Sequence, residues 1–169
     1  YGKHIVLENY IRDVFNIYKM SCLGTNKLQN IYNLLSQYKN NDIQHRAGIE
    51  RPEQELIAKF LPIDCCVLEM GGESGTTSLI INKILKDPTK HVLVEPARNS
   101  IPKLEYVKQL YNASFNIAHG FVGRNRTEHE KLWDECKTCK MFDITDLENM
   151  VNQKFDVFVI DCEGAFYNI

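Results

Sequence analysis

Hydrophobic residues in the first third of the chain recur at helical spacing. Leu7, Ile11, Val14 and Tyr18 lie three or four positions apart, which places them on one face of an amphipathic helix. The same spacing occurs twice more before residue 64, and the last of these helices has a proline in its first turn. The first two helices form an expected N-terminal helical cap over residues 1–52. The three expected helices are Leu7–Tyr18, Leu28–Tyr38 and Pro52–Leu61.

From residue 64 onward, short apolar runs alternate with helical periodicity. The runs with the length of buried strands are Cys65–Met70, His91–Glu95, Ser114–His119 and Phe155–Ile160. Helices are expected at Thr76–Lys86, Leu104–Tyr111 and Thr145–Val151, with a long polar insertion at Gly120–Lys140. Strands that alternate with helices through short connections pair in parallel. The sequence therefore predicts an α/β fold over residues 53–169, with a Rossmann-like, doubly wound, mostly parallel sheet.

Composition fits an ordinary globular domain and excludes two classes of partner. Of 169 residues, 44% are hydrophobic and 25% are charged, and the formal net charge is −2. Nucleic-acid binding needs a concentrated basic face, which neither half of the chain has. The longest apolar runs are far shorter than the roughly 18–20 residues that span a bilayer. We therefore expect no nucleic acid and no membrane as partners.

The six cysteines indicate a reducing compartment. Three of them lie in apolar runs, where a free cysteine packs as a small hydrophobic residue, and nothing else indicates secretion. A cytoplasmic location is therefore expected. Cys136 and Cys139 have the spacing of a zinc-binding pair, but no second pair of ligands follows, so no metal site is predicted.

A glycine-rich turn after the first expected strand carries the main functional signal. Gly71, Gly72 and Gly75 follow the strand, and a helix is expected to begin at once. Glycine allows a tight turn and lets a ligand approach main-chain N–H groups with no Cβ between them. Ser74 or Thr76 is expected to cap the helix. A plain tight turn without a ligand is the alternative.

An acidic residue at the end of the second expected strand completes the pattern. Glu95 stands twenty residues after the last glycine, where an acid accepts hydrogen bonds from the ribose hydroxyls of an adenosine-containing cofactor. A dinucleotide site would show G-x-G-x-x-G, whereas the glycines here are spaced G-G-x-x-G. Glu69 and Glu73 would repel a pyrophosphate but favour the sulfonium and ammonium groups of S-adenosyl-L-methionine (AdoMet). The charges therefore favour AdoMet over NAD.

Four motifs, in family order, resemble those of class I AdoMet-dependent methyltransferases of the FkbM type. Glu69–Ser78 resembles the family's D-x-G-A-N-x-G motif, and Val92–Pro96 resembles its strand ending in F-E-P. Phe142–Leu147 resembles its T-L-D-x-L segment, and Phe158–Ala165 resembles its K-I-D-V-E-G-A signature. The resemblance covers about residues 53–169 and implies an AdoMet-binding, Rossmann-like methyltransferase domain.

The resemblance also implies roles for individual residues. Glu69, which replaces the family's Asp, would face the ammonium group of the methionyl chain, and Glu95 would hold the ribose. Ala118 and His119 would lie near the adenine, although His119 could equally be a solvated residue at a strand end. The expected cofactor-binding residues are Glu69, Gly71, Gly72, Glu73, Ser74, Gly75, Glu95, Pro96, Ala118, His119 and Asp161.

Asp161 and Glu163 form the candidate catalytic pair. Asp161 ends the last expected strand, where an α/β sheet opens its ligand crevice. A carboxylate there could remove the proton of an acceptor hydroxyl as the oxygen attacks the methyl group. It could instead help to hold a divalent cation, which nothing else in the sequence supports, or cap the next helix.

The leading interpretation is an AdoMet-dependent methyltransferase. The acceptor, a hydroxyl on a sugar, glycan or other small polar metabolite, is implied by the resemblance alone. One alternative is an AdoMet-binding partner module without catalysis. A less favoured one is a nicotinamide-dependent oxidoreductase, against which the acidic turn and the glycine spacing count.

The length of the chain adds one expectation. The resembled family has seven strands, and only four are recognised here, so the domain is interpreted as C-terminally short. Phe155–Ile160 is apolar enough to be covered on both faces, and such a strand at a sheet edge would favour aggregation. We expect downstream sequence, an oligomer or other partner chain, or the N-terminal segment to lie beside it.

Overall fold

The computed structural model describes residues 33, 50–123 and 139–162. The expected helices Leu7–Tyr18 and Leu28–Tyr38 lie outside the described residues, apart from Asn33, which is helical. The elements in chain order are α4 (Arg51–Phe60), β1 (Val67–Met70), α5 (Thr76–Ile84), the short 3₁₀ helix η1 (Pro88–Lys90), β2 (His91–Glu95), α6 (Ser100–Leu110), β3 (Asn116–Val122), β4 (Lys140–Phe142), α8 (Ile144–Val151) and β5 (Val157–Ile160).

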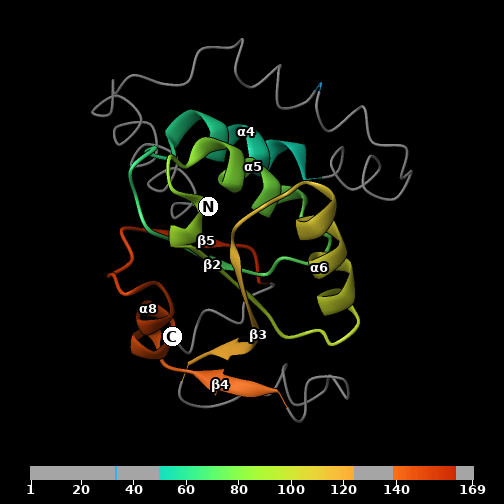
Figure 1. Ribbon diagram of the computed structural model, residues 1–169, viewed down its shortest axis with the longest axis vertical. Coiled ribbons are helices and arrows are strands. Elements are labelled where there is room, and N and C mark those ends of the chain that lie inside the picture. The colour runs from blue at the N-terminus through green and yellow to red at the C-terminus, as the bar shows by residue number, and fades with distance from the viewer. Residues whose placement is uncertain (1–32, 34–49, 124–138, 163–169) are drawn as a thin grey trace, which may run out of the picture.

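The described strands form one five-stranded sheet, and every neighbouring pair is parallel (Figure 1). The strand order is β4-β3-β2-β1-β5, so the chain moves outward from β1 to β4 and then returns to the other side of β1. This is a Rossmann-like arrangement, and it confirms the predicted α/β fold class.

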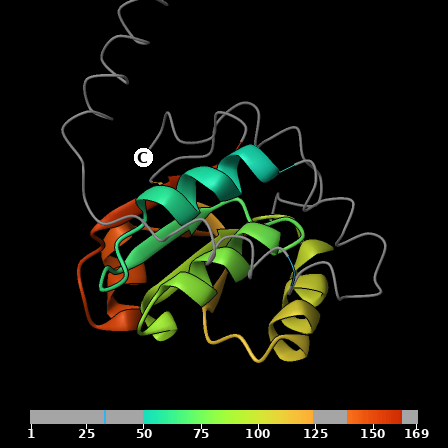
Figure 2. The same cartoon turned by 90° about the horizontal axis from the view of Figure 1, so that it is seen from above.

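Helices cover both faces of the sheet. On one face, α4, α5 and α6 pack against residues such as Val67, Leu93 and Phe115. On the other face, Leu147 of α8 packs against Leu68 and other sheet residues. Figure 2 shows α6 and α8 on opposite sides of the molecule. The sheet is therefore doubly wound, as the alternation of strands and helices predicts.

The sequence interpretation was wrong about the start of the polar insertion. Strand β3 continues to Val122, beyond the expected end at His119, and its last three residues pair with β4. The pairing begins at Gly120 opposite Lys140, and the buried side chains of Val122 and Phe142 pack in the same core cluster. Because β4 has only three residues, it carries no periodicity from which a strand could be predicted.

Strand β5 lies at the edge of the described sheet. Val157 and Val159 pack against the core, but Phe158 and Ile160 are 45% and 46% exposed. Among the described residues, β5 is thus covered on one face only, and the expected neighbour beside it stays a prediction.

Helix α4 belongs to the body of the domain. It packs against α5, and its Ala58 and the following Leu61 are buried in the core. The expected boundary between residues 52 and 53 therefore falls within the first turn of α4.

The cysteines that the structure describes are free thiols, and Cys65 and Cys66 are buried as expected. Burial raises the pKa of the Cys65 thiol to about 11. Cys136 lies outside the described residues. No helix in the described part of the chain is long and apolar enough to cross a membrane.

Leu147→Ala should destabilise the fold strongly. Leu147 is fully buried and fixes α8 on the sheet, and truncating such a side chain costs about 2–5 kcal/mol. Met150→Ala on the same helix is the matched control, because Met150 is 45% exposed. Urea unfolding monitored by circular dichroism measures both variants. Equal, small losses of unfolding free energy in the two variants would contradict the packing of α8 against the sheet through Leu147.

Candidate functional site

A cavity of about 940 Å³ opens at the carboxyl ends of the strands. It lies beside β1, where β2 occupies one side and β5 the other. Parallel α/β sheets bind ligands at this point because the chain leaves the neighbouring strands in opposite directions. The walls come from α4, the glycine turn, the start of α6 and the ends of β1, β2, β3 and β5.

The turn after β1 has the tight geometry that its glycines predict. Gly71 has a φ of 90°, and a Cβ there would lie 1.8 Å from the carbonyl oxygen of Asp161. Its N–H donates to the carbonyl oxygen of Val94 at 3.0 Å, which ties the turn to β2. Gly75 has a φ of 77° and is the N-cap of α5. Residues with a Cβ rarely adopt such φ values, so glycine is required at both positions.

Glu95 closes the turn from the side of β2. Its Oε2 accepts hydrogen bonds from the N–H groups of Gly72 (2.9 Å) and Glu73 (3.0 Å), and its Oε1 accepts one from Ala97 (2.7 Å). Glu95 is 5% exposed and lies in the cavity wall. A carboxylate has about four lone-pair positions, so about one remains for a ligand.

Glu69 is also among the residues that line the cavity. Its Oε2 lies 2.8 Å from Nε2 of His91, and the two side chains are 1% and 0% exposed. Its other oxygen, Oε1, is buried and has no hydrogen-bond partner among the described residues. A buried carboxylate oxygen without a donor is costly, which makes this atom a candidate ligand contact.

Glu50 is a site residue that the sequence analysis missed. Its carboxylate accepts hydrogen bonds from the hydroxyls of Ser74 (3.4 Å), Thr77 (3.1 Å) and Thr76. Burial raises the pKa of Glu50, and the nearby charges of Glu73 and Asp161 raise it further, against the lowering effect of the threonine hydroxyls. Glu50 precedes α4 without any motif, so only the packing of α4 beside α5 could reveal it.

These contacts correct the expected helix cap. Neither Ser74 nor Thr76 caps α5, because Gly75 occupies the N-cap position and makes no side-chain cap hydrogen bond. The two hydroxyls donate to Glu50 instead. In a cap the hydroxyl oxygen would accept a hydrogen bond from a backbone N–H, whereas here the hydroxyls act as donors to the carboxylate.

Asp161 follows β5 directly and lies in the cavity wall with an exposed side chain. Its N–H donates to the carbonyl oxygen of Met70 at 2.9 Å, so its backbone is held against the end of β1. Its partner in the expected catalytic pair, Glu163, lies outside the described residues. The structure therefore brings Asp161 to the cavity together with Glu50, Glu69 and Glu95.

The third strand enters the cavity wall further along than expected. The wall contains Gly120, Phe121 and Val122 and does not contain Ala118 or His119, because β3 continues past them. Ala118 is buried against α8 on the opposite face of the sheet.

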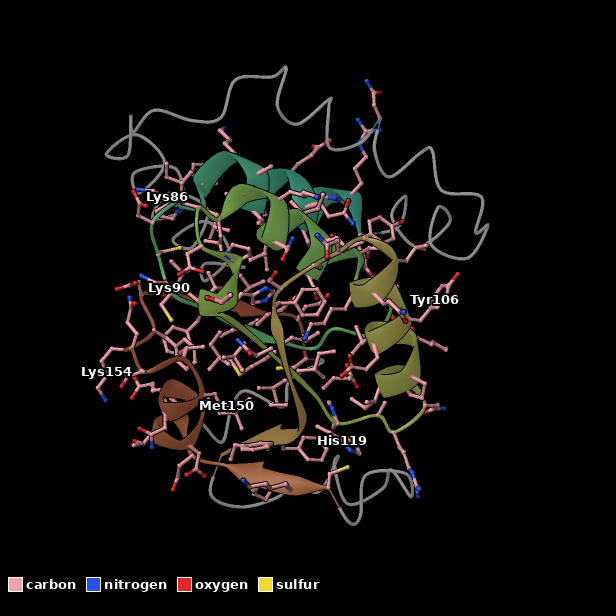
Figure 3. The ribbon with its side chains drawn as sticks, in the orientation of Figure 1. Lys86, Lys90, Tyr106, His119, Met150 and Lys154 are labelled. Carbon is pink, nitrogen blue, oxygen red and sulfur yellow. The ribbon has the colours of Figure 1, made fainter. Side chains whose placement is uncertain are left out.

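His119 is engaged at the end of the sheet. Figure 3 shows it beside the start of β4, and its Nε2 lies 3.2 Å from the carbonyl oxygen of Pro96 and 3.4 Å from Sγ of Cys139. Pro96 itself lies in the wall, as do Gly71, Gly72 and Glu73. The roles of Ala118 and His119 at an adenine stay predictions.

The cavity is acidic and has apolar sides. Glu50, Glu53, Glu69, Glu73, Glu95 and Asp161 line it, whereas Lys103 is the one lysine or arginine in the wall among the described residues. Apolar side chains of α4 and β5 supply much of the remaining wall. No group of three or more His, Cys, Asp or Glu residues in the described part of the chain is arranged to hold a metal ion. The wall thus suits a ligand with cationic groups.

The chain was also compared with known proteins. No known family model matches it, and no curated protein matches its sequence. Among solved structures, it is similar to the O-methyltransferase from Bacillus cereus in complex with SAH (S-adenosylhomocysteine), with 12% identity and a TM-score of 0.36. The likeness covers 93% of this chain and 60% of that protein, so the chain spans less than two thirds of that enzyme. So distant a likeness leaves the function to the geometry of the cavity.

Glu50→Gln should change how the stability of the protein depends on pH. Because burial raises its pKa above the ordinary 4.5, the folded chain holds the proton more tightly than the unfolded chain does. That contribution is complete below pH 4.5 and is lost as the pH rises through the raised folded pKa. The wild type should therefore lose stability relative to Glu50→Gln as the pH rises from acid toward neutrality.

Urea unfolding of both proteins at several pH values measures this difference. Glu53→Gln is the control, since Glu53 is exposed in the first turn of α4, three residues after Glu50, and its variant should follow the wild type. A difference between wild type and Glu50→Gln that stays constant with pH would show that Glu50 is not the titrating group.

Proposed function

We propose that this chain binds AdoMet and catalyses methyl transfer to a hydroxyl oxygen of a sugar or other small polar metabolite. The observation that carries the proposal is the acidic cavity around the glycine turn, in which buried Glu69 keeps one carboxylate oxygen without a partner among the described residues. AdoMet brings an ammonium, a sulfonium and a ribose, and these groups suit a wall of carboxylates. Bound AdoMet supplies an activated methyl group.

The occupancy of the turn amides favours AdoMet over a dinucleotide. A pyrophosphate binds to free main-chain N–H groups at the start of the helix after the glycine turn. Here the N–H groups of Gly72 and Glu73 donate to the Glu95 carboxylate, and the N–H of Gly75 donates to the carbonyl oxygen of Gly72 at 2.6 Å. A pyrophosphate would have to displace a carboxylate and lie beside further acids. The nicotinamide-dependent alternative is therefore disfavoured.

Three residues of the cavity have distinct roles in this proposal. Glu95 accepts a hydrogen bond from one ribose hydroxyl through its remaining lone pair. Glu69 accepts a hydrogen bond from the ammonium group, directly or through a water molecule. Asp161, which is exposed at the end of β5, takes the proton of the acceptor hydroxyl as the oxygen attacks. The apolar sides exclude water from the reacting groups.

Glu95→Gln should weaken SAH binding about tenfold or more, because an amide has one acceptor oxygen where the carboxylate has two. Isothermal titration calorimetry measures the affinity. The unliganded melting temperature reports any loosening of the turn separately. Glu105→Gln, an exposed change on α6, is the control and should bind as the wild type does. Unchanged affinity in Glu95→Gln would remove the ribose assignment.

Asp161→Asn should leave AdoMet affinity within a few-fold and lower methyl transfer about 100-fold, since a positioned base contributes that order of magnitude. The assay measures formation of SAH with a panel of sugar and polyol acceptors, with and without Mg²⁺. Asp146→Asn, exposed on α8, is the control. Near-normal turnover in Asp161→Asn would exclude Asp161 as the base. Wild type that binds SAH but methylates no acceptor would favour the non-catalytic binding module.

A further inference from the structure

His91 and Glu69 form a buried polar pair between the neighbouring strands β1 and β2. His91 begins β2 and Glu69 lies near the end of β1, and both side chains are on the face of the sheet that α5 covers. Their contact joins Nε2 to Oε2 at 2.8 Å, and the exposures are 0% and 1%. None of the motifs in the sequence assigns a role to His91.

The hydrogen-bonding capacity of the pair is only half used. Oε1 of Glu69 and Nδ1 of His91 are both buried without a partner among the described residues. We assign Nε2–H of His91 as the donor to Oε2 of Glu69, because a carboxylate in its ionised form only accepts. A neutral imidazole then leaves Nδ1 as a lone acceptor beside the Phe115 ring, at 5.4 Å between ring centroids. This arrangement leaves no buried N–H without an acceptor.

In that state the pair keeps one negative charge. No lysine or arginine among the described residues forms an ion pair with Glu69. A buried carboxylate that is held by one N–H retains a large desolvation cost, which a second donor with positive charge would lower. Glu69 lies in the wall of the cavity, so the ligand can supply that donor.

We propose that His91 is a positioning residue for the ligand's ammonium group. Its Nε2–H holds Oε2 of Glu69, which fixes the carboxylate and leaves Oε1 as the acceptor for the primary ammonium of an amino-acid chain. The inference rests on the proposed function and deepens it, because it makes a buried imidazole that does not touch the ligand responsible for recognising the amino-acid end.

Two ligands separate this role from a merely structural one. SAH carries the amino-acid chain with its ammonium, whereas 5′-methylthioadenosine has the same adenosine and thioether but lacks the amino-acid group. Both lack the sulfonium charge. A defect in the fold of the cavity would weaken both ligands, but a misplaced Glu69 would weaken SAH alone.

The test uses the full chain with His91→Leu, which fills a similar volume but removes the donor, and His91→Gln, which retains an N–H donor. Calorimetric titration should show about a tenfold loss of SAH affinity in His91→Leu, with 5′-methylthioadenosine binding within about twofold of the wild type. His91→Gln should recover most of the SAH affinity. Glu69→Gln should show the same selective loss and serves as the second variant if His91→Leu does not fold.

The outcomes distinguish the two proposals. Wild type that binds neither ligand would overturn the proposed function and this inference with it. Wild type that binds both ligands, with His91→Leu or Glu69→Gln losing both equally or neither, would overturn only the role of the pair. Selective loss of SAH with recovery in His91→Gln supports it.

Discussion

The carboxylate of Glu95 is the contact on which the cavity depends. It accepts hydrogen bonds from three main-chain N–H groups. Two belong to Gly72 and Glu73 of the glycine turn, and the third belongs to Ala97, two residues after Glu95. The two bonds from the turn hold the end of β2 against the turn that follows β1 and precedes α5. The bond from Gly72 is buried and those from Glu73 and Ala97 are partly buried, so the carboxylate supplies an acceptor to N–H groups that folding withdraws from water. The same contact removes the amides that a phosphate would need.

The core of the fold could be predicted because its signal is local. His91–Glu95 has the bounds of the observed β2, since five consecutive buried residues leave little choice of structure. The tight turn was also predictable, because Gly71 and Gly75 occupy φ values that other residues rarely adopt. Parallel pairing followed from the alternation of strands and helices, and the strand order agrees with it.

The missed features depend on contacts between distant segments. Strand β4 exists because Gly120 and Lys140 are brought side by side, and its three residues carry no pattern of their own. Glu50 enters the site because α4 packs against α5, which places its carboxylate near three hydroxyls. The hydroxyls of Ser74 and Thr76 donate to that acid, and Gly75 occupies the N-cap position of α5. The preference of serine and threonine for helix N-caps therefore did not identify their partner.

The two buried carboxylates of the cavity differ in what they leave for a ligand. Glu95 is nearly saturated by backbone donors, so it gives the turn its shape and has little capacity left. Glu69 has one donor from His91 and one oxygen with no partner among the described residues. A new hydrogen bond gains most where a buried group is still unsatisfied, because the desolvation cost has already been incurred in folding. The free energy available for recognising a cationic group is therefore concentrated at Glu69, while Glu95 acts mainly by holding the turn.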